Sequence, residues 1–386
     1  MLGNSFGRFF RITTSGESYS GAFRKNLGIN DELFGGLVVI IDGVPAGIEV
    51  TSEIIQEELD KRRPGQSRLD TPRKETDKAY VLSGVMEDQL TTGAPVAIYI
   101  PNRDITDLQL EKHRSFKSTV RPGQASLTYN AKYGKHADWA GAGRASGRET
   151  AARVAGGAVA KAVLSKFGIE VIAYTVESHG IKAKSVTFEE AKANYRKNEI
   201  NCPDLGTAEQ MIDDLLKVKA TGDTCGGIIE IVAKGVPAGL GEPVFDKLEA
   251  LLAHGLMSIG AVKGVEFGEG FELARKTGSE SNDFPYVDEA TGKIKHSTNR
   301  AGGILGGISN GEEIRIRVAV KPTPTISKVQ KTVDIDKMEN IEVQYTTRND
   351  PSIIPRIYPV CEAMVSIVLA DALFMAGGYK EIQDKI

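Results

Sequence analysis

Residues 141–163, GAGRASGRETAARVAGGAVAKAV, decide how the rest of this chain is arranged. A glycine-rich loop opens the stretch and runs directly into a helical pattern. Glu149 and Thr150 stand where the first helical turn should begin, and acidic or hydroxyl side chains favour a helix N-terminus. The helix that follows consists almost entirely of alanine, glycine and valine, so another backbone or a flat ligand can approach it closely. We therefore predict a central helix.

The loop that precedes this helix is a candidate anion site. It carries Arg144, Ser146 and Arg148. Free backbone N–H groups and the positive end of a helix dipole favour an anion, and guanidinium groups add bidentate recognition of phosphate. The alternative is a tightly packed core helix behind a solvated basic loop, and this stretch alone leaves both interpretations open.

Composition narrows the class of protein. The 386 residues are 41% hydrophobic and 26% charged, as in ordinary globular proteins, and a net charge of −3 argues against a dedicated nucleic-acid binder. The three cysteines are widely separated, so neither disulfides nor a metal site is predicted. No apolar run approaches the ~18 residues of a membrane span, and the N-terminus lacks a signal-peptide core. We expect a cytoplasmic protein.

The pentapeptide GVPAG occurs twice, at 43–47 and 235–239, half a chain length apart. Each copy follows an apolar strand candidate (37–41 and 226–232) and precedes a helix candidate (52–61 and 244–254). The repeated order favours an internal duplication over coincidence. We predict one domain, 1–386, made of two similarly built halves. Further predicted elements are strands at 94–100, 171–176, 261–267 and 313–320, helices at 188–198 and 208–218, and an apolar helical region at 353–376 broken by Pro355 and Pro359.

Arginine recurs in four short loops rich in glycine or proline: 61–68, 121–124, 144–148 and 348–351. Loops placed by a rigid scaffold are where binding residues concentrate. If these loops converge, they form a cationic pocket for a small molecule with carboxylate and phosphate groups. The alternative is four solvated basic turns.

Groups for proton transfer are few. Of the five histidines, His136 stands out because it lies just upstream of the arginine loop, although a lone loop histidine can equally be structural. Asp350, close to Arg348, is either a base or a turn-capping aspartate. The chain has no Walker A, GxGxxG or HExxH motif, and GESYSG has the wrong order for the GxSxG of serine hydrolases.

Longer motifs carry a family resemblance. GNSFGRFFRITTSGES, DGVPAG, LDKRRPGQSR, GRASGRETAARVAGGAVAK, NRAGGILGGISNG, KPTPTI and RNDP resemble the chorismate synthase family in order and spacing, over nearly the full length. The resemblance implies an α+β fold, a β-α-β sandwich of antiparallel sheets around helices, assembled as a homotetramer. It also implies a lyase that binds reduced FMN and 5-enolpyruvylshikimate-3-phosphate and carries out an anti 1,4-elimination of phosphate to give chorismate. NADPH is the candidate reductant of the flavin.

The resemblance assigns site roles to individual residues. Substrate anions are assigned to Arg62, Arg68, Arg121, Arg148 and Arg348. Flavin contacts are assigned to Arg144, Ala145, Ser146, Gly260, Ala261, Gly306, Lys321, Pro322, Thr323, Pro324, Thr325 and Arg348. Asp350 matches the acidic residue that, in the family, assists deprotonation at flavin N5. The resemblance also places Ser146 close to the substrate.

The chain departs from the family pattern at two histidines. Tyr19 and Ser20 replace the histidine of GESHG, and Gln124 replaces that of RPGHA. Tyrosine has an ordinary pKa of about 10 and glutamine does not titrate, while loss of a positioned acid costs about 10²–10⁴-fold in rate. Tyr19 or His136 is the predicted substitute donor. The alternatives are a paralogue that binds flavin and an anionic metabolite with little or no elimination, an enzyme for a related ring, and a binding module that the net acidity disfavours.

Overall fold

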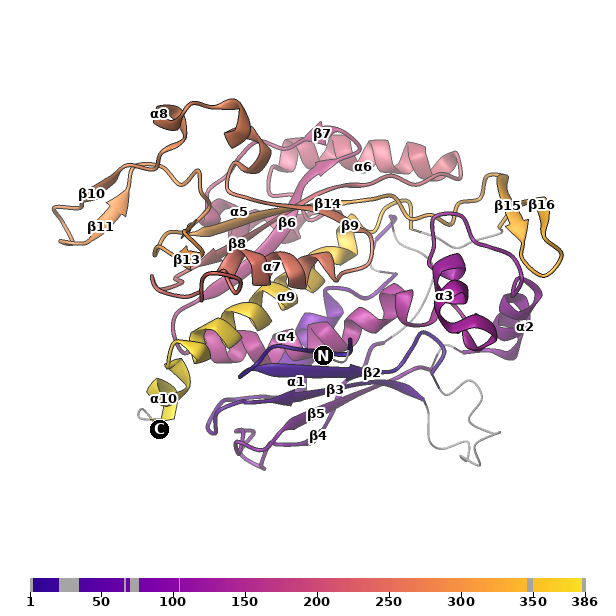
Figure 1. Ribbon diagram of the computed structural model, residues 1–386, viewed down its shortest axis with the longest axis horizontal. Helices are drawn as coiled ribbons and strands as arrows, with labels where there is room; N and C mark the ends of the chain where they lie inside the picture. The colour runs from indigo at the N-terminus through magenta and orange to yellow at the C-terminus, as the bar shows by residue number, and fades with distance from the viewer. Residues whose placement is uncertain are drawn as a thin grey trace.

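Two five-stranded antiparallel sheets enclose a layer of long helices (Figure 1), which confirms the predicted α+β sandwich. The computed structural model describes residues 3–20, 35–65, 67–69, 76–103, 105–345 and 350–383. In the first sheet the strand order is β1 (Ser5–Phe6), β2 (Arg11–Ser15), β3 (Gly36–Asp42), β5 (Val96–Pro101), β4 (Tyr80–Ser83). In the second it is β7 (Ile181–Lys182), β6 (Glu170–Ser178), β8 (Gly227–Lys234), β14 (Ile314–Val320), β9 (Val262–Phe267).

Helices α4 (Thr150–Ser165) and α9 (Ile354–Met375) form the middle layer. The small residues of α4 allow this packing. A Cβ at Gly157 would lie 2.3 Å from the Cβ of Ala363 on α9, while one at Gly156 would lie 3.3 Å from Ile12 of the first sheet. The helix therefore joins α9 on one side to a sheet on the other, as its sequence predicts.

Gly157→Ala is expected to lower the free energy of unfolding by about 1–3 kcal/mol, because the added methyl meets the backbone of α9. Gly156→Ala is the matched control. Its Cβ meets the side chains of Ile12, Val39 and Ile41 rather than backbone, and alanine is the better helix former by about 1 kcal/mol. Urea unfolding of both variants tests the packing, and equal losses would show that the two glycines are not distinguished by α9.

The predicted break in the last long helix is wrong, since α9 runs without interruption. Pro355 lies in the first turn, where a backbone N–H is not needed. Pro359 cannot donate to the carbonyl of Pro355, but the Asn201 amide Nδ2 donates to that oxygen at 3.1 Å. Helix α9 is long and apolar enough to cross a membrane, although no such run was expected from the sequence. That part of the helix is wholly buried inside the protein.

The strand–GVPAG–helix order is present in both halves. The first unit is β3 followed by α1 (Ser52–Asp60), and the second is β8 followed by α7 (Leu248–Met257). Strands β3 and β8 each occupy the third place in their sheets. Helix α7 begins later than predicted because a turn, in which the Glu242 N–H donates to the Asp246 carbonyl, precedes it. The other predicted elements correspond to β5, β6, β9 and β14, α5 (Phe188–Asn194) and α6 (Leu205–Ala220).

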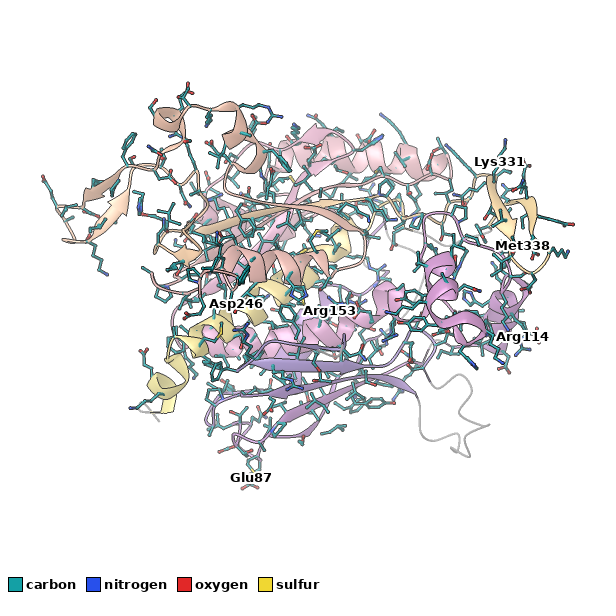
Figure 2. All side chains as sticks on the ribbon, in the orientation of Figure 1. Glu87, Arg114, Arg153, Asp246, Lys331 and Met338 are labelled. Atoms are coloured by element: carbon teal, nitrogen blue, oxygen red, sulfur yellow. The ribbon has the colours of Figure 1, made fainter. Side chains whose placement is uncertain are left out.

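One end of the molecule carries α2 (Asp107–Ser115), α3 (Ser126–Tyr133) and the β15 (Gln330–Asp334)–β16 (Glu339–Val343) hairpin (Figure 1). Arg114, Lys331 and Met338 mark this end in Figure 2. The hairpin supports the 121–124 turn, because the Val120 N–H donates to the Val333 carbonyl. Remaining elements are η2 (Gly134–His136), η3 (Gly143–Ala145), η4 (Gly147–Glu149), η5 (Tyr195–Lys197), η6 (Gly270–Arg275), α8 (Gly278–Ser281), β10 (Pro285–Val287), β11 (Ile294–His296), β12 (Ile304–Leu305), β13 (Ile308–Ser309) and α10 (Gly378–Gln383).

Candidate active site

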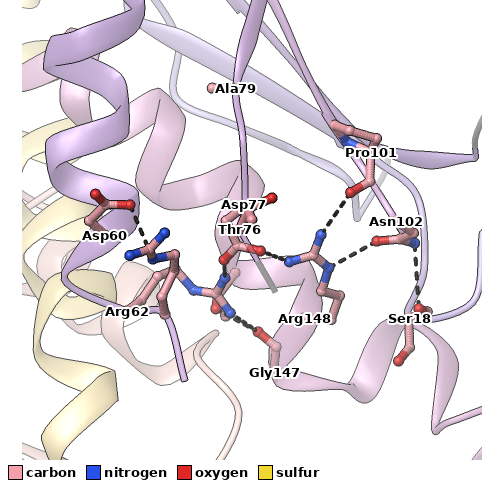
Figure 3. A network of polar contacts seen from close by, with 12 residues as sticks. Ser18, Asp60, Arg62, Thr76, Asp77, Ala79, Pro101, Asn102, Gly147 and Arg148 are labelled. Carbon is pink, nitrogen blue, oxygen red and sulfur yellow. Dashed lines mark hydrogen bonds and ion pairs between the residues drawn. The ribbon is translucent and has the colours of Figure 1, made fainter. Parts of the chain in front are cut away.

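A buried carboxylate, Asp77, joins two of the predicted arginines (Figure 3). Its two oxygens form ion pairs with Arg62, which follows α1, and Arg148, which precedes α4. Burial alone would raise the pKa of Asp77, but the two guanidinium charges hold it below its ordinary value. Neither the sequence patterns nor the family resemblance identified this residue.

Arg148 also fixes the turn that precedes Tyr19. Its Nε donates to Asn102 Oδ1 at 2.9 Å and a terminal nitrogen donates to the Pro101 carbonyl at 3.2 Å. The amide of Asn102 in turn donates to the carbonyls of Glu17 (3.1 Å) and Ser18 (3.4 Å). The arginine loop and the GES turn therefore form one hydrogen-bonded unit, part of which Figure 3 shows.

Arg356, in the first turn of α9, connects Asp350 to the Arg62 loop. Its Nε donates to the Arg62 carbonyl at 3.0 Å, and its NH1 donates to Asp350 Oδ2 at 2.6 Å. Asp350 is buried, with 8% of its surface exposed. Sequence reasoning missed Arg356, although an arginine at the start of an otherwise apolar helix is a signal that could have found it.

The 321–325 run lies against the RPG turn. Lys321 Nζ donates to the Gly123 carbonyl at 2.8 Å, and Gln124 donates to the hydroxyl of Thr325. The Lys321 N–H donates to the Ala261 carbonyl at 2.9 Å. Thr323 Oγ1 donates to the Asp350 carbonyl at 3.4 Å. Pro322 and Pro324 belong to this run, and Gly260 precedes Ala261, so most of the predicted flavin contacts lie in one region.

Arg121 is a cation of this region that has no ion-pair partner among the described residues. It is partly buried, and within the part of the chain that the structure describes its guanidinium forms no hydrogen bond or ion pair. Burial lowers its pKa, an effect that the nearby Tyr345, Asp138 and Tyr19 oppose. Among the described residues, Gln124 Oε1 and the Tyr345 hydroxyl are also buried without a partner. A partly buried cation beside buried polar atoms without partners indicates a site for an anionic ligand.

The 144–146 loop is exposed at its tip. Arg144 donates to Asn4 Oδ1 (3.2 Å) and to the Tyr133 hydroxyl (3.0 Å), and it lies over the Tyr133 ring at 5.8 Å. Ser146 Oγ accepts from the Arg148 N–H at 3.3 Å, which fixes the start of η4. Ala145 is exposed. The hydroxyl and guanidinium that the resemblance assigns to the flavin are thus held in place by neighbouring residues.

Three other predicted site residues, Arg68, Gly306 and His136, form no hydrogen bond or ion pair with Arg121 or the 321–325 run in the part of the chain that the structure describes. The side chain of Arg68 is 69% exposed and pairs with Glu199 at 2.8 Å. The turn that contains Gly306 packs near the start of β14, whereas Lys321 follows its end. His136 is exposed in η2. Arg348 lies outside the described residues.

Loops of the sandwich gather guanidinium and ammonium groups around Arg121, which has no ion-pair partner among the described residues, an arrangement suited to an enzyme that binds an anionic small molecule. A model of the chorismate synthase family matches residues 10–374. The chain is 67% identical to a chorismate synthase of Acetivibrio thermocellus, covering 100% of this chain and 98% of that protein. It is 48% identical to one of Methanosarcina mazei, with 98% of each covered. A chorismate synthase crystal structure superposes with a TM-score of 0.73 at 32% identity, over 96% of this chain and 93% of that one.

The chain belongs to the chorismate synthase family, and its class of enzyme is a carbon–oxygen lyase. Nothing in the comparisons favours a paralogue that only binds its ligands.

Proposed function

We propose that this chain eliminates phosphate from 5-enolpyruvylshikimate-3-phosphate in the anti 1,4 sense to give chorismate, with reduced FMN bound. The observation that supports this most is the Arg121 guanidinium, partly buried and unpaired among the described residues, next to the turn that Lys321 contacts. A ligand with a phosphate and carboxylates supplies the negative charge that this region lacks.

The chain's own residues position the substrate and stabilise the charge that builds up on departing phosphate. Asp77 keeps Arg62 and Arg148 in fixed orientations, while Arg121 and Lys321 remain available to oxygens of the ligand. The Asp350 carboxylate, held by Arg356, is the proposed proton acceptor. Its place in this network keeps it next to the 321–325 run.

The residues present fit a flavin. Gln124 Oε1 and the Tyr345 hydroxyl are buried polar atoms without partners among the described residues, and a heteroaromatic ring with donor and acceptor groups would satisfy them. Arg144, Ala145, Ser146 and the 321–325 run are the residues that would hold it. When bound, reduced FMN supplies electron density that assists the departure of phosphate.

The test is turnover under anaerobic conditions. Purified protein, reduced FMN and 5-enolpyruvylshikimate-3-phosphate are expected to yield chorismate and inorganic phosphate in equal amounts, and oxidised FMN alone is expected to yield neither. Binding of flavin and substrate without either product would instead support the binding-only paralogue.

The same proposal includes a single domain that arose by internal duplication, a homotetramer in the cytoplasm, and NADPH as the flavin reductant. The recurrent strand–GVPAG–helix order supports the duplication. Light scattering measures the oligomer, and loss of NADPH absorbance with FMN in the absence of oxygen measures the reductase activity.

A further inference from the structure

Tyr19 is paired with His113, a histidine that no sequence motif singles out. The Tyr19 hydroxyl lies 3.0 Å from Nε2 of His113, and the two rings meet edge to face with centroids 5.0 Å apart. Tyr19 follows the GES turn, whereas His113 lies in the last turn of α2, 94 residues further along the chain. Tyr19 is 8% exposed, and His113 is partly buried.

Packing fixes the position of this hydroxyl. Gly141, at the start of the arginine loop, lies so close to the ring that an added Cβ would be 2.3 Å from Tyr19 Cε2. Leu110 and Ala140 form a small apolar cluster with the same ring. The preceding residue, Ser18, is tied to Asn102 and through it to Arg148. The Tyr19–His113 pair is therefore held in a fixed position relative to Arg148.

Charged groups surround the pair on several elements. The Arg121 guanidinium interacts with Tyr19, and Asp138 interacts with Arg121 and Glu17. On α2 itself, His113 stands between Lys112 and Arg114. Because Arg121, which has no ion-pair partner among the described residues, interacts with Tyr19, an anion bound at Arg121 would lie near this pair.

We propose that His113 and Tyr19 form a proton-donating couple that serves the departing phosphate, an inference that rests on the proposed function. As the carbon–oxygen bond breaks and its electron pair stays on phosphate, the Tyr19 O–H bond breaks and its proton goes to a phosphate oxygen. The Nε2 proton of the His113 imidazolium moves to the Tyr19 oxygen. The net change is one proton from imidazolium to phosphate, and solvent returns it to His113 after product release.

The ordinary pKa values of the two side chains explain why Tyr19 needs His113. Tyrosine alone, with a pKa of about 10, is a weak donor near neutral pH, whereas histidine changes charge there. His113 acts through Tyr19 and is a positioning residue, because the Tyr19 hydroxyl contacts His113 and Tyr19 is the member of the pair that interacts with the Arg121 guanidinium.

Kinetics of Tyr19→Phe, His113→Gln and the double variant test the couple, with His179→Asn, a histidine paired with Asp214, as the control. Each single variant of the pair is expected to lower kcat about 10²-fold. The double variant should lower it no further, because both substitutions interrupt the same proton path. The rate of the parent protein should fall as pH rises through the His113 pKa, and His113→Gln should lack that dependence. A double variant whose loss in kcat is the product of the two single losses would overturn the couple. An unchanged pH profile in His113→Gln would also overturn it.

A second measurement does not depend on turnover. Inorganic phosphate is titrated into the protein while the His113 imidazole is followed by NMR. Phosphate at Arg121 is expected to raise the His113 pKa, and less so in Tyr19→Phe. If this response is seen but the parent protein makes no chorismate, the proposed function fails, while the position of the pair beside a phosphate site stands. If His113 does not respond to phosphate in the parent protein, the couple fails whatever the turnover.

Discussion

Asp77→Asn is expected to lower the free energy of unfolding by about 3–5 kcal/mol, because it removes one partner of a buried ion network. The carboxylate is 2% exposed and faces both Arg62 and Arg148, so its loss leaves two buried guanidinium charges facing each other. The loop that begins α4 and the end of α1 should both loosen. Turnover should fall together with stability, because Arg148 holds the GES turn in place through Asn102.

Urea unfolding at several pH values measures this effect. The pKa of Asp77 is lowered from its ordinary value of 3.8, so its contribution is fully present above that value and is lost as pH falls through the lower folded pKa. The difference between parent and variant should be constant from pH 7 to about pH 5 and should begin to close below 3.8. Asp336→Asn, at an exposed turn, is the control. An equally small loss in both variants would show that Asp77 is not the centre of the network.

The central layer could be predicted because its cause is local. The alanine and glycine run of α4 dictates a close approach by whatever packs on it, and Gly157 indeed meets Ala363. The error at Pro359 has the opposite origin. The proline rule is local, but the group that satisfies the Pro355 carbonyl is Asn201, which lies 154 residues away. Compensation by a distant side chain leaves no trace in the pattern around Pro359.

In the candidate site, too, some residues could be predicted from local sequence and others could not. Arg62, Arg148 and Lys321 stand in recognisable motifs, so their side chains could be named from the sequence. Asp77 could not, because its importance comes from two arginines 15 and 71 residues away that the fold brings to it. His113 is also identified only by its contact with Tyr19. Motifs thus identified the cations, while their buried partners required the structure.

Arg121→Gln is expected to leave the protein as stable or more stable by about 1 kcal/mol, while lowering turnover about 10³-fold. The guanidinium is partly buried and has no counter-ion among the described residues, so the folded state bears a desolvation cost that glutamine removes. The same charge is available to a phosphate oxygen when the ligand is bound. Stability and activity should therefore move in opposite directions.

Thermal unfolding with and without inorganic phosphate separates the two roles. Phosphate should raise the Tm of the parent protein by binding the folded state, and should raise that of Arg121→Gln much less. Arg275→Gln, which removes an exposed ion pair with Glu272, should retain both turnover and the response to phosphate. A variant with a lower Tm that still responds to phosphate would mean that Arg121 has a structural role. Replacement of a residue that serves only to bind the ligand should stabilise the free protein and at the same time inactivate the enzyme.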